Sequence, residues 1–219
     1  SEILNISVAD IACGSGIFLE EAFAYLQDYC VQWYICNGQT DHLIETGIDL
    51  YKLPLQEKKD ILCSCIYGID IDIHAVEVAK FSLLIKLIED ETAPSVSEVV
   101  PILPDLGDNI QFGNSLVSQT ELNGISGANR QMMEIAPFDW STINNGCGFD
   151  VIIGNPPYVN TEGMHALLPS AEVEVYKKKY KTSHKQFDKY FIFIEQAINK
   201  INENGLVCYI VPNKFFKIG

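Results

Sequence analysis

The fold can be read outward from one segment, Phe149-Asp150-Val151-Ile152-Ile153-Gly154-Asn155-Pro156-Pro157-Tyr158. Its first five residues are mostly apolar and β-branched or aromatic, which predicts a buried parallel strand without a hydrophilic face. The two prolines cannot continue the strand, and they fix the backbone just past its carboxyl end. Ligands bind at that end of the strands in an open α/β sheet. The segment therefore predicts an amide, a backbone carbonyl and an aromatic ring held together at the mouth of a sheet.

The tetrapeptide Asn155-Pro156-Pro157-Tyr158 resembles the catalytic motif of amino-methyltransferases that use S-adenosylmethionine (SAM), above all the N6-adenine DNA methyltransferases. The adenine amine is a poor nucleophile because its lone pair is delocalised into the ring. The Asn155 side-chain oxygen and the Pro156 carbonyl could each accept one amine hydrogen, which localises the lone pair for attack on the sulfonium methyl group. Proline rigidity keeps both acceptors aimed, and Tyr158 offers a face for an adenine rotated out of the duplex. The alternative is an ordinary Pro-Pro turn after a strand.

Composition favours one intracellular domain. The 219 residues are 47% hydrophobic, which is enough for a single core. The seven cysteines form no CxxC pair and no ligand spacing with histidine, so we expect reduced thiols and no metal site. We find no signal peptide and no apolar run long enough to span a membrane. The expected location is the cytoplasm.

The net charge of −14 is unevenly distributed. Residues 1–159 carry 6 basic and 23 acidic side chains, a net charge of −17, whereas residues 160–219 carry 9 lysines and 6 acids, a net charge of +3. A strongly acidic chain argues against nucleic-acid binding. The basic part follows the tetrapeptide, however, which is compatible with DNA that meets one edge only or with a DNA-binding part outside this chain.

A second motif begins near the amino terminus. Asn5 to Ile11 predicts a first strand, Ala12-Cys13-Gly14-Ser15-Gly16 a glycine turn, and Ile17 to about Tyr34 a helix, which is the opening of a nucleotide-binding βα unit. The string Ala9 to Leu19 resembles the SAM loop of the adenine methyltransferases, with Ile11 where the family usually has proline. The resemblance implies cofactor contacts from Asp10, Ala12, Cys13, Gly14 and Gly16.

The second strand is predicted over Cys65 to Asp72, followed by a helix from Ala75 to Ile88. An acid at the end of such a strand binds ribose hydroxyls in βαβ nucleotide sites. Asp70 and Asp72 are the candidates, and Asp72 is better placed to cap the helix. The resemblance assigns the ribose to Asp70 and adds Ile71 to the cofactor contacts.

The third strand and its loop are predicted over Ile110 to Leu116. At the position of Asn114 the family usually has an aspartate, which accepts a hydrogen bond from the adenine amine of SAM. An amide oxygen can accept the same bond without the charge. The resemblance thus implies Asn114 and Ser115 as cofactor contacts, and a simple turn is the alternative.

The remaining segments were less informative. Residues 36–64 look like an insertion with a short helix after Leu53-Pro54, and residues 117–148 like a polar connection. Residues 159–185 look like a loop, in which the basic run Tyr176 to Lys181 is either a solvated helix end or a phosphate contact. Gln186 to Ile201 predicts an amphipathic helix, and Leu206 to Val211 a fifth buried strand.

Taken together, the motifs predict an α/β chain with the Rossmann-like fold of SAM-dependent methyltransferases. We expect a mostly parallel sheet with helices on both faces, truncated after the fifth strand, in a single domain over residues 1–219. The order and spacing resemble the gamma arrangement and the methyltransferase part of fused type II restriction-modification enzymes. The family's N-terminal motif, its last strands and its C-terminal target-recognition domain are expected outside these residues, so activity of this chain alone should be low.

The implied reaction is methyl transfer from SAM to the N6 amine of a flipped adenine in double-stranded DNA. Two alternatives stay open. Amino-methyltransferases of protein glutamine or ribosomal RNA use a similar loop, although their chains are more compact. A non-catalytic scaffold for a partner subunit would not need the tetrapeptide. A nicotinamide dehydrogenase is disfavoured because no GxGxxG is present. The oligomeric state is not predicted.

Overall fold

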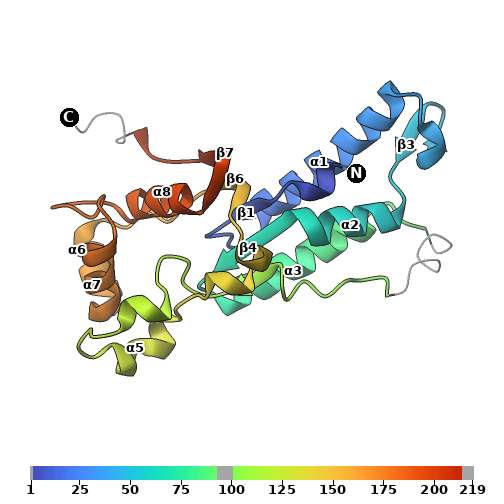
Figure 1. Cartoon of the computed structure of the whole chain (residues 1–219). Helices are drawn as coiled ribbons and strands as arrows, with labels where there is room; N and C mark the ends of the chain where they lie inside the picture. The colour runs from blue at the N-terminus through green and yellow to red at the C-terminus, as the bar shows by residue number, and fades with distance from the viewer. Residues whose placement is uncertain (1, 93–100, 214–219) are drawn as a thin grey trace.

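A parallel sheet forms the centre of the molecule, with helices on both of its faces (Figure 1). The computed structural model describes residues 2–92 and 101–213. In this part of the chain the central sheet contains β1 (Val8–Asp10), β4 (Ile66–Asp70), β5 (Ile110–Phe112), β6 (Phe149–Gly154) and β7 (Ile201–Tyr209). Their spatial order is β5-β4-β1-β6-β7, and every neighbouring pair is parallel. The predicted α/β fold with a mostly parallel sheet is confirmed.

The strand order places β1 at the point where the chain reverses direction across the sheet. From β1 the chain moves outward to β4 and β5, and it then returns to the other side of β1 to form β6 and β7. Val8 accordingly has Ile66 as its partner on one side and Val151 on the other. In doubly wound sheets the ligand site lies outside the carboxyl ends of the strands at such a switch point.

Two apolar cores follow from the alternation of side chains along the strands. Ile66 belongs to the core under α1 (Ile17–Cys36), α2 (Leu55–Cys65) and α3 (Ile73–Ile88). Its neighbour Tyr67 belongs to the core under α5 (Ala128–Ile135), α6 (Thr161–Leu167), α7 (Ser170–Lys179) and α8 (Lys189–Lys200). Figure 1 shows the first group of helices on one side of the sheet and the second group on the other. Both faces are covered, as predicted.

The two insertions have structure of their own. In the first, a short 3₁₀ helix η2 (Thr40–His42) precedes an antiparallel hairpin of β2 (Ile44–Gly47) and β3 (Leu50–Lys52), and the helix predicted after Pro54 is confirmed as α2. A further 3₁₀ helix, η1 (Glu2–Asn5), precedes β1. The second insertion holds α5 and the 3₁₀ helices η3 (Gln119–Leu122), η4 (Trp140–Thr142) and η5 (Asn144–Gly146). It also buries Ile135 and Phe138, so it contributes to the core.

The prediction of a loop over residues 159–185 is wrong, because α6 and α7 occupy most of it. The rings of Tyr176 and Tyr180 are buried, at 0% and 3% exposure, so neither is a surface for stacking bases. Lys177, Lys178 and Lys179 form the last turn of α7, which agrees with the helix-end interpretation of this run.

The prediction of a buried fifth strand is also wrong in one respect. The strand exists as β7, but Leu206 is 68% exposed. The reason is topological: β7 is the last strand in the order and pairs only with β6 among the described residues. Within these same residues, no helix is both long and apolar enough to cross a membrane.

Candidate active site

A cavity of about 280 Å³ lies where the carboxyl ends of β1, β4, β5 and β6 converge. It brings together seven of the residues predicted from sequence: Ala12, Asp70, Ile71, Asn114, Ser115, Asn155 and Pro157. It is also lined by Ile11, Gly113, Lys189 and Phe193. The six other predicted residues, Asp10, Cys13, Gly14, Gly16, Pro156 and Tyr158, do not line the cavity. Asp10 ends β1, and the other five lie in the turns that follow β1 and β6.

The turn after β1 is held by carboxylates rather than by glycine alone. Asp10 Oδ1 accepts a hydrogen bond from the Ala12 amide at 3.0 Å, and Asp70 Oδ2 accepts one from the Gly14 amide at 2.8 Å. Gly16 has a φ of 89°, and a Cβ on it would lie 2.9 Å from the Cβ of Ala79 in α3. Glycine is therefore required at position 16 for the close packing of α1 on α3.

Asp10 lies behind the cavity wall. Its side chain is 2% exposed, and burial raises the pKa of its carboxyl group to about 7, with a further contribution from the nearby Asp70 carboxylate. A side chain on Gly154 would meet the Asp10 carboxylate at 2.6 Å, so the end of β6 packs directly on it. Cys13 is also buried, and burial raises the pKa of its thiol, which keeps it protonated. In this arrangement the two side chains support the turn.

The two aspartates near the end of β4 make different contacts. Asp72 Oδ1 accepts a hydrogen bond from the His74 amide at 2.9 Å, so the prediction that Asp72 caps α3 is confirmed. Asp70 instead faces the cavity, beside the half-exposed Ile71. Its two oxygens accept hydrogen bonds from the amides of Gly14 and Asp72, which fixes the carboxylate while leaving lone pairs for a ligand.

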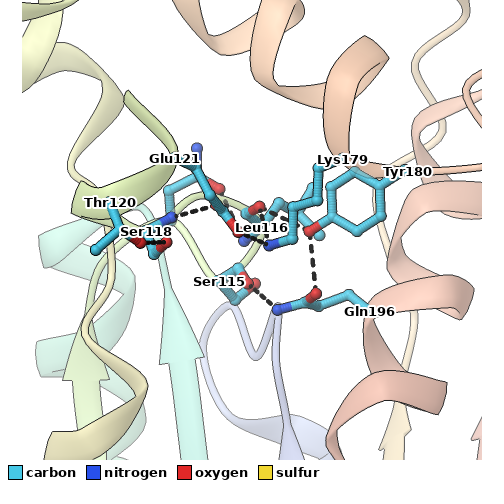
Figure 2. Close-up of polar contacts among 9 residues, drawn as sticks. Ser115, Leu116, Ser118, Thr120, Glu121, Lys179, Tyr180 and Gln196 are labelled. Carbon is cyan, nitrogen blue, oxygen red and sulfur yellow. Dashed lines mark hydrogen bonds and ion pairs between the residues drawn. The ribbon is translucent and has the colours of Figure 1, made fainter. Parts of the chain in front are cut away.

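The loop after β5 is anchored from three directions, as Figure 2 shows for its contacts with α7 and α8. Ser115 Oγ donates to the Ile11 carbonyl at 2.6 Å, and the Gln196 amide donates to the Ser115 carbonyl at 2.8 Å. Tyr180 donates to the Leu116 carbonyl at 2.7 Å. Burial raises the pKa of Tyr180, so its hydroxyl remains a donor. The loop is rigid where it meets the cavity, because its carbonyls are held by buried side chains.

The side chain of Asn114 makes two hydrogen bonds within the protein. Its oxygen accepts a hydrogen bond from the Leu116 amide at 3.1 Å, and its NH₂ group donates to Glu172 Oε1 at 3.0 Å. The residue lines the cavity as expected. The oxygen that was expected to face a cofactor is thus already engaged once, with one lone pair left.

The loop after β6 starts at the cavity and leads away from it. Asn155 lines the cavity and is exposed, whereas Pro156 is buried. The hydroxyl of Tyr158 contacts the Asn155 side-chain oxygen and donates to the Ile210 carbonyl at 2.8 Å. The Tyr158 ring is half-exposed and lies edge-on to Tyr190, with centroids 5.9 Å apart. The end of β7 thereby holds the loop in place.

Two charged residues of the site were missed. Lys189, at the start of α8, lines the cavity at 8% exposure, with its Nζ 3.6 Å from Oε1 of the buried Glu172. Burial lowers the pKa of Lys189, and the Glu172 carboxylate opposes this shift. The helix predicted over Gln186 to Ile201 contains Lys189, but its sequence does not indicate that this side chain is buried at the cavity. Glu172 lies in the segment for which the sequence predicts a loop, so its burial is not indicated either.

The lining suits a nucleoside cofactor. The Asp70 carboxylate at the end of β4 can accept hydrogen bonds from ribose hydroxyls. Ile71 and Phe193 give apolar surface for a flat ring. Among the described residues no three His, Cys, Asp or Glu side chains are grouped as metal ligands. A second groove of about 730 Å³, lined by Ile3, Trp33 and Glu57 among others, lies near the start of β1 and contains none of the site residues predicted from sequence.

The strand order, the cavity at the switch point and the loop after β6 define an α/β methyltransferase fold. Residues 64–219 match the family described as Eco57I restriction-modification methylase, and the chain belongs to this family. It is 46% identical over 217 residues to the type II restriction enzyme and methyltransferase RM.Eco57I of Escherichia coli, covering 99% of this chain and 21% of that protein.

More distant proteins match this chain in sequence or in structure. The type II methyltransferase M.BstVI of Geobacillus stearothermophilus is 24% identical over 215 residues, which are 97% of this chain and 29% of that protein. Among solved structures, the DrdV–DNA complex matches with a TM-score of 0.55 at 18% identity, over 96% of this chain and 18% of that one. The type ISP restriction-modification enzyme LlaBIII bound to DNA matches with a TM-score of 0.53 at 17% identity, over 96% and 13%. The chain thus spans less than a third of each.

Proposed function

We propose that this chain transfers a methyl group from SAM to the N6 amine of adenine in double-stranded DNA, within a restriction-modification enzyme. One observation carries the proposal. The loop Asn155-Pro156-Pro157-Tyr158 leaves β6 at the mouth of the strand-end cavity, and Asn155 and Pro157 line that cavity themselves. A group bound in the cavity and a group bound at the loop would therefore be neighbours, as a direct transfer between them requires.

The cavity is the proposed cofactor site, and bound SAM would supply the electrophilic methyl group. The Asp70 carboxylate would accept hydrogen bonds from the ribose hydroxyls, because both its oxygens are fixed and retain free lone pairs. Ile71 and Phe193 would flank the adenine ring of the cofactor, and Asn114 would meet its amine. The turn from Ala12 to Gly16 would lie along the methionine part.

The loop is the proposed site of the target amine. The side-chain oxygen of Asn155 and the carbonyl of Pro156 would each accept one amine hydrogen, which turns the nitrogen lone pair toward the methyl group without a strong general base. Tyr158 contacts Asn155 through its hydroxyl and exposes about half of its ring surface, so it can hold the amide and also stack on a flipped base.

DNA is the proposed substrate partner. The DrdV and LlaBIII structures are complexes with DNA, and the family is one of restriction-modification methylases. We further propose that target recognition resides in residues outside these 219, because RM.Eco57I is about five times as long as the matched region. The exposed Lys177 and Lys178 at the end of α7 are candidates for phosphate contacts.

The test is methyl transfer from labelled SAM by the full-length protein to unmethylated DNA, followed by digestion and separation of nucleosides. We expect the label in N6-methyladenine, and we expect Asn155→Ala to abolish it while the variant still binds S-adenosylhomocysteine. Label found only in added ribosomal RNA or protein would show that the substrate is an amine or amide other than adenine in DNA. No transfer to any of these, with cofactor binding intact, would favour a scaffold.

A further inference from the structure

Glu172 is a buried carboxylate at the wall of the cavity. It comes from the first turn of α7 and is 1% exposed. Three groups converge on its Oε1 atom: the NH₂ of Asn114 at 3.0 Å, the hydroxyl of Tyr176, and the Nζ of Lys189 at 3.6 Å. Burying a carboxylate is unfavourable unless it is paired and hydrogen-bonded. This cluster meets both conditions next to a ligand cavity.

The cluster determines the orientation of the Asn114 side-chain amide. In the present orientation the NH₂ group meets the Glu172 carboxylate and the oxygen meets the Leu116 N–H. A rotation of the amide by half a turn would place oxygen against carboxylate and NH₂ against N–H. Both contacts would then be repulsive, and both groups are buried at the loop, where an unpaired polar group is costly. Only one orientation is compatible with Glu172.

We propose that Glu172 is a positioning residue for cofactor recognition, which fixes Asn114 with its oxygen available to accept a hydrogen bond from the adenine amine of the cofactor. The proposal rests on the proposed function of the cavity. The Asn114 oxygen keeps one lone pair after it accepts the Leu116 amide. A carboxylate bound to the NH₂ end also polarises the amide, which makes the oxygen a stronger acceptor.

The same geometry explains the residue type at position 114. An aspartate there would place a second carboxylate about 3 Å from Glu172, and two carboxylates at such a distance do not both ionise. With asparagine, the negative charge at this end of the cavity belongs to Glu172, and Lys189 supplies the adjacent positive charge. The negative charge and the hydrogen-bond acceptor for the cofactor thus belong to two different residues. This arrangement predicts that the carboxylate and the amide can be exchanged between positions 172 and 114.

The exchange is the basis of the experiment. Four forms of the full-length protein are compared: the native protein, Glu172→Gln, Asn114→Asp, and the double variant that carries both changes and keeps the net charge. Glu174→Gln, on the exposed side of the same helix, is the matched control. Isothermal titration calorimetry gives Kd values for S-adenosylhomocysteine and for S-inosylhomocysteine, in which a carbonyl replaces the purine amine. Thermal unfolding of each form checks that it is folded.

We expect the native protein and the Glu174→Gln control to prefer S-adenosylhomocysteine by about tenfold, which is the size of one well-placed hydrogen bond. Glu172→Gln should reduce this preference to about twofold, because the amide at 172 no longer dictates the orientation of Asn114. Asn114→Asp should weaken S-adenosylhomocysteine binding by about tenfold. The double variant should return to within about threefold of the native preference, even if a single variant is poorly folded.

Two results would overturn the inference while leaving the proposed function intact. One is a native preference that Glu172→Gln leaves unchanged. The other is a double variant that binds no better than the weaker single variant. A native protein that binds neither compound would instead contradict the proposed function, and the inference with it.

Discussion

Asp10 makes the stability of this protein depend on pH in a way that can be measured. Burial, offset in part by the hydrogen bond from the Ala12 amide and reinforced by the Asp70 carboxylate, raises the pKa of Asp10 from its ordinary 3.8 to about 7. At ~1.36 kcal/mol per pH unit, ionising this carboxyl group in the folded protein costs about 4 kcal/mol more than in the unfolded chain. Asp10→Asn cannot ionise, so we expect it to be more stable than the native protein at pH 8 by up to about 4 kcal/mol.

The direction of this pH dependence follows from the number of protons bound to the folded and the unfolded protein. Between about pH 4 and pH 7 the folded protein holds a proton on Asp10 that the unfolded chain has lost, so the free energy of unfolding of the native protein falls as the pH rises. Above pH 7 the carboxyl group is ionised in both states, and the difference between variant and native protein is constant. The stability gained by Asp10→Asn should therefore grow from near zero at about pH 4 to its full size above pH 7.

Urea unfolding followed by far-ultraviolet circular dichroism at pH 4.5, 5.5, 6.5 and 8 measures this difference. Asp28→Asn, at an exposed position of α1, is the control, and its stability should follow that of the native protein at every pH. A difference between Asp10→Asn and the native protein that stays constant from pH 4.5 to pH 8 would refute the reasoning.

Three further outcomes follow from the geometry. Gly16→Ala should lower the free energy of unfolding by about 2 kcal/mol in urea titrations, because its Cβ would lie 2.9 Å from that of Ala79; an unchanged midpoint would contradict this. Tyr158→Phe should reduce kcat by about tenfold with unchanged S-adenosylhomocysteine affinity, since it removes the hydroxyl that holds Asn155. Asp70→Asn should weaken S-adenosylhomocysteine binding in calorimetry by at least about tenfold, and undiminished affinity would remove the ribose assignment.

The sequence was informative wherever a local pattern has one structural solution. An apolar run that ends in two prolines can only be a strand that stops, and β6 stops at Gly154. A glycine turn between a strand and an apolar helix is likewise unambiguous, as β1 and α1 show. Asp72 was assigned correctly because helix capping depends on neighbours two residues away. The seven predicted residues that line the cavity came instead from the resemblance to the methyltransferase family.

The errors arose where tertiary contacts decide. The burial of β7 depends on its place in the sheet order, which its own apolar sequence does not contain. Glu172 and Lys189 belong to different helices, and charged residues in helices are usually exposed. The packing of α7 and α8 on the loop after β5 nevertheless buries both. No periodicity in a single sequence reports a pair of buried charges formed across two helices.

We propose that the strand-end cavity holds the cofactor with its reactive sulfur beside Asn155. A crystal structure of the full-length protein with S-adenosylhomocysteine tests this most directly. We expect ribose hydroxyls at hydrogen-bond distance from the Asp70 carboxylate, the purine between Ile71 and Phe193, and the sulfur facing the loop after β6. A ligand bound in the groove beside Ile3 and Trp33, or one whose sulfur points away from Asn155, would contradict it.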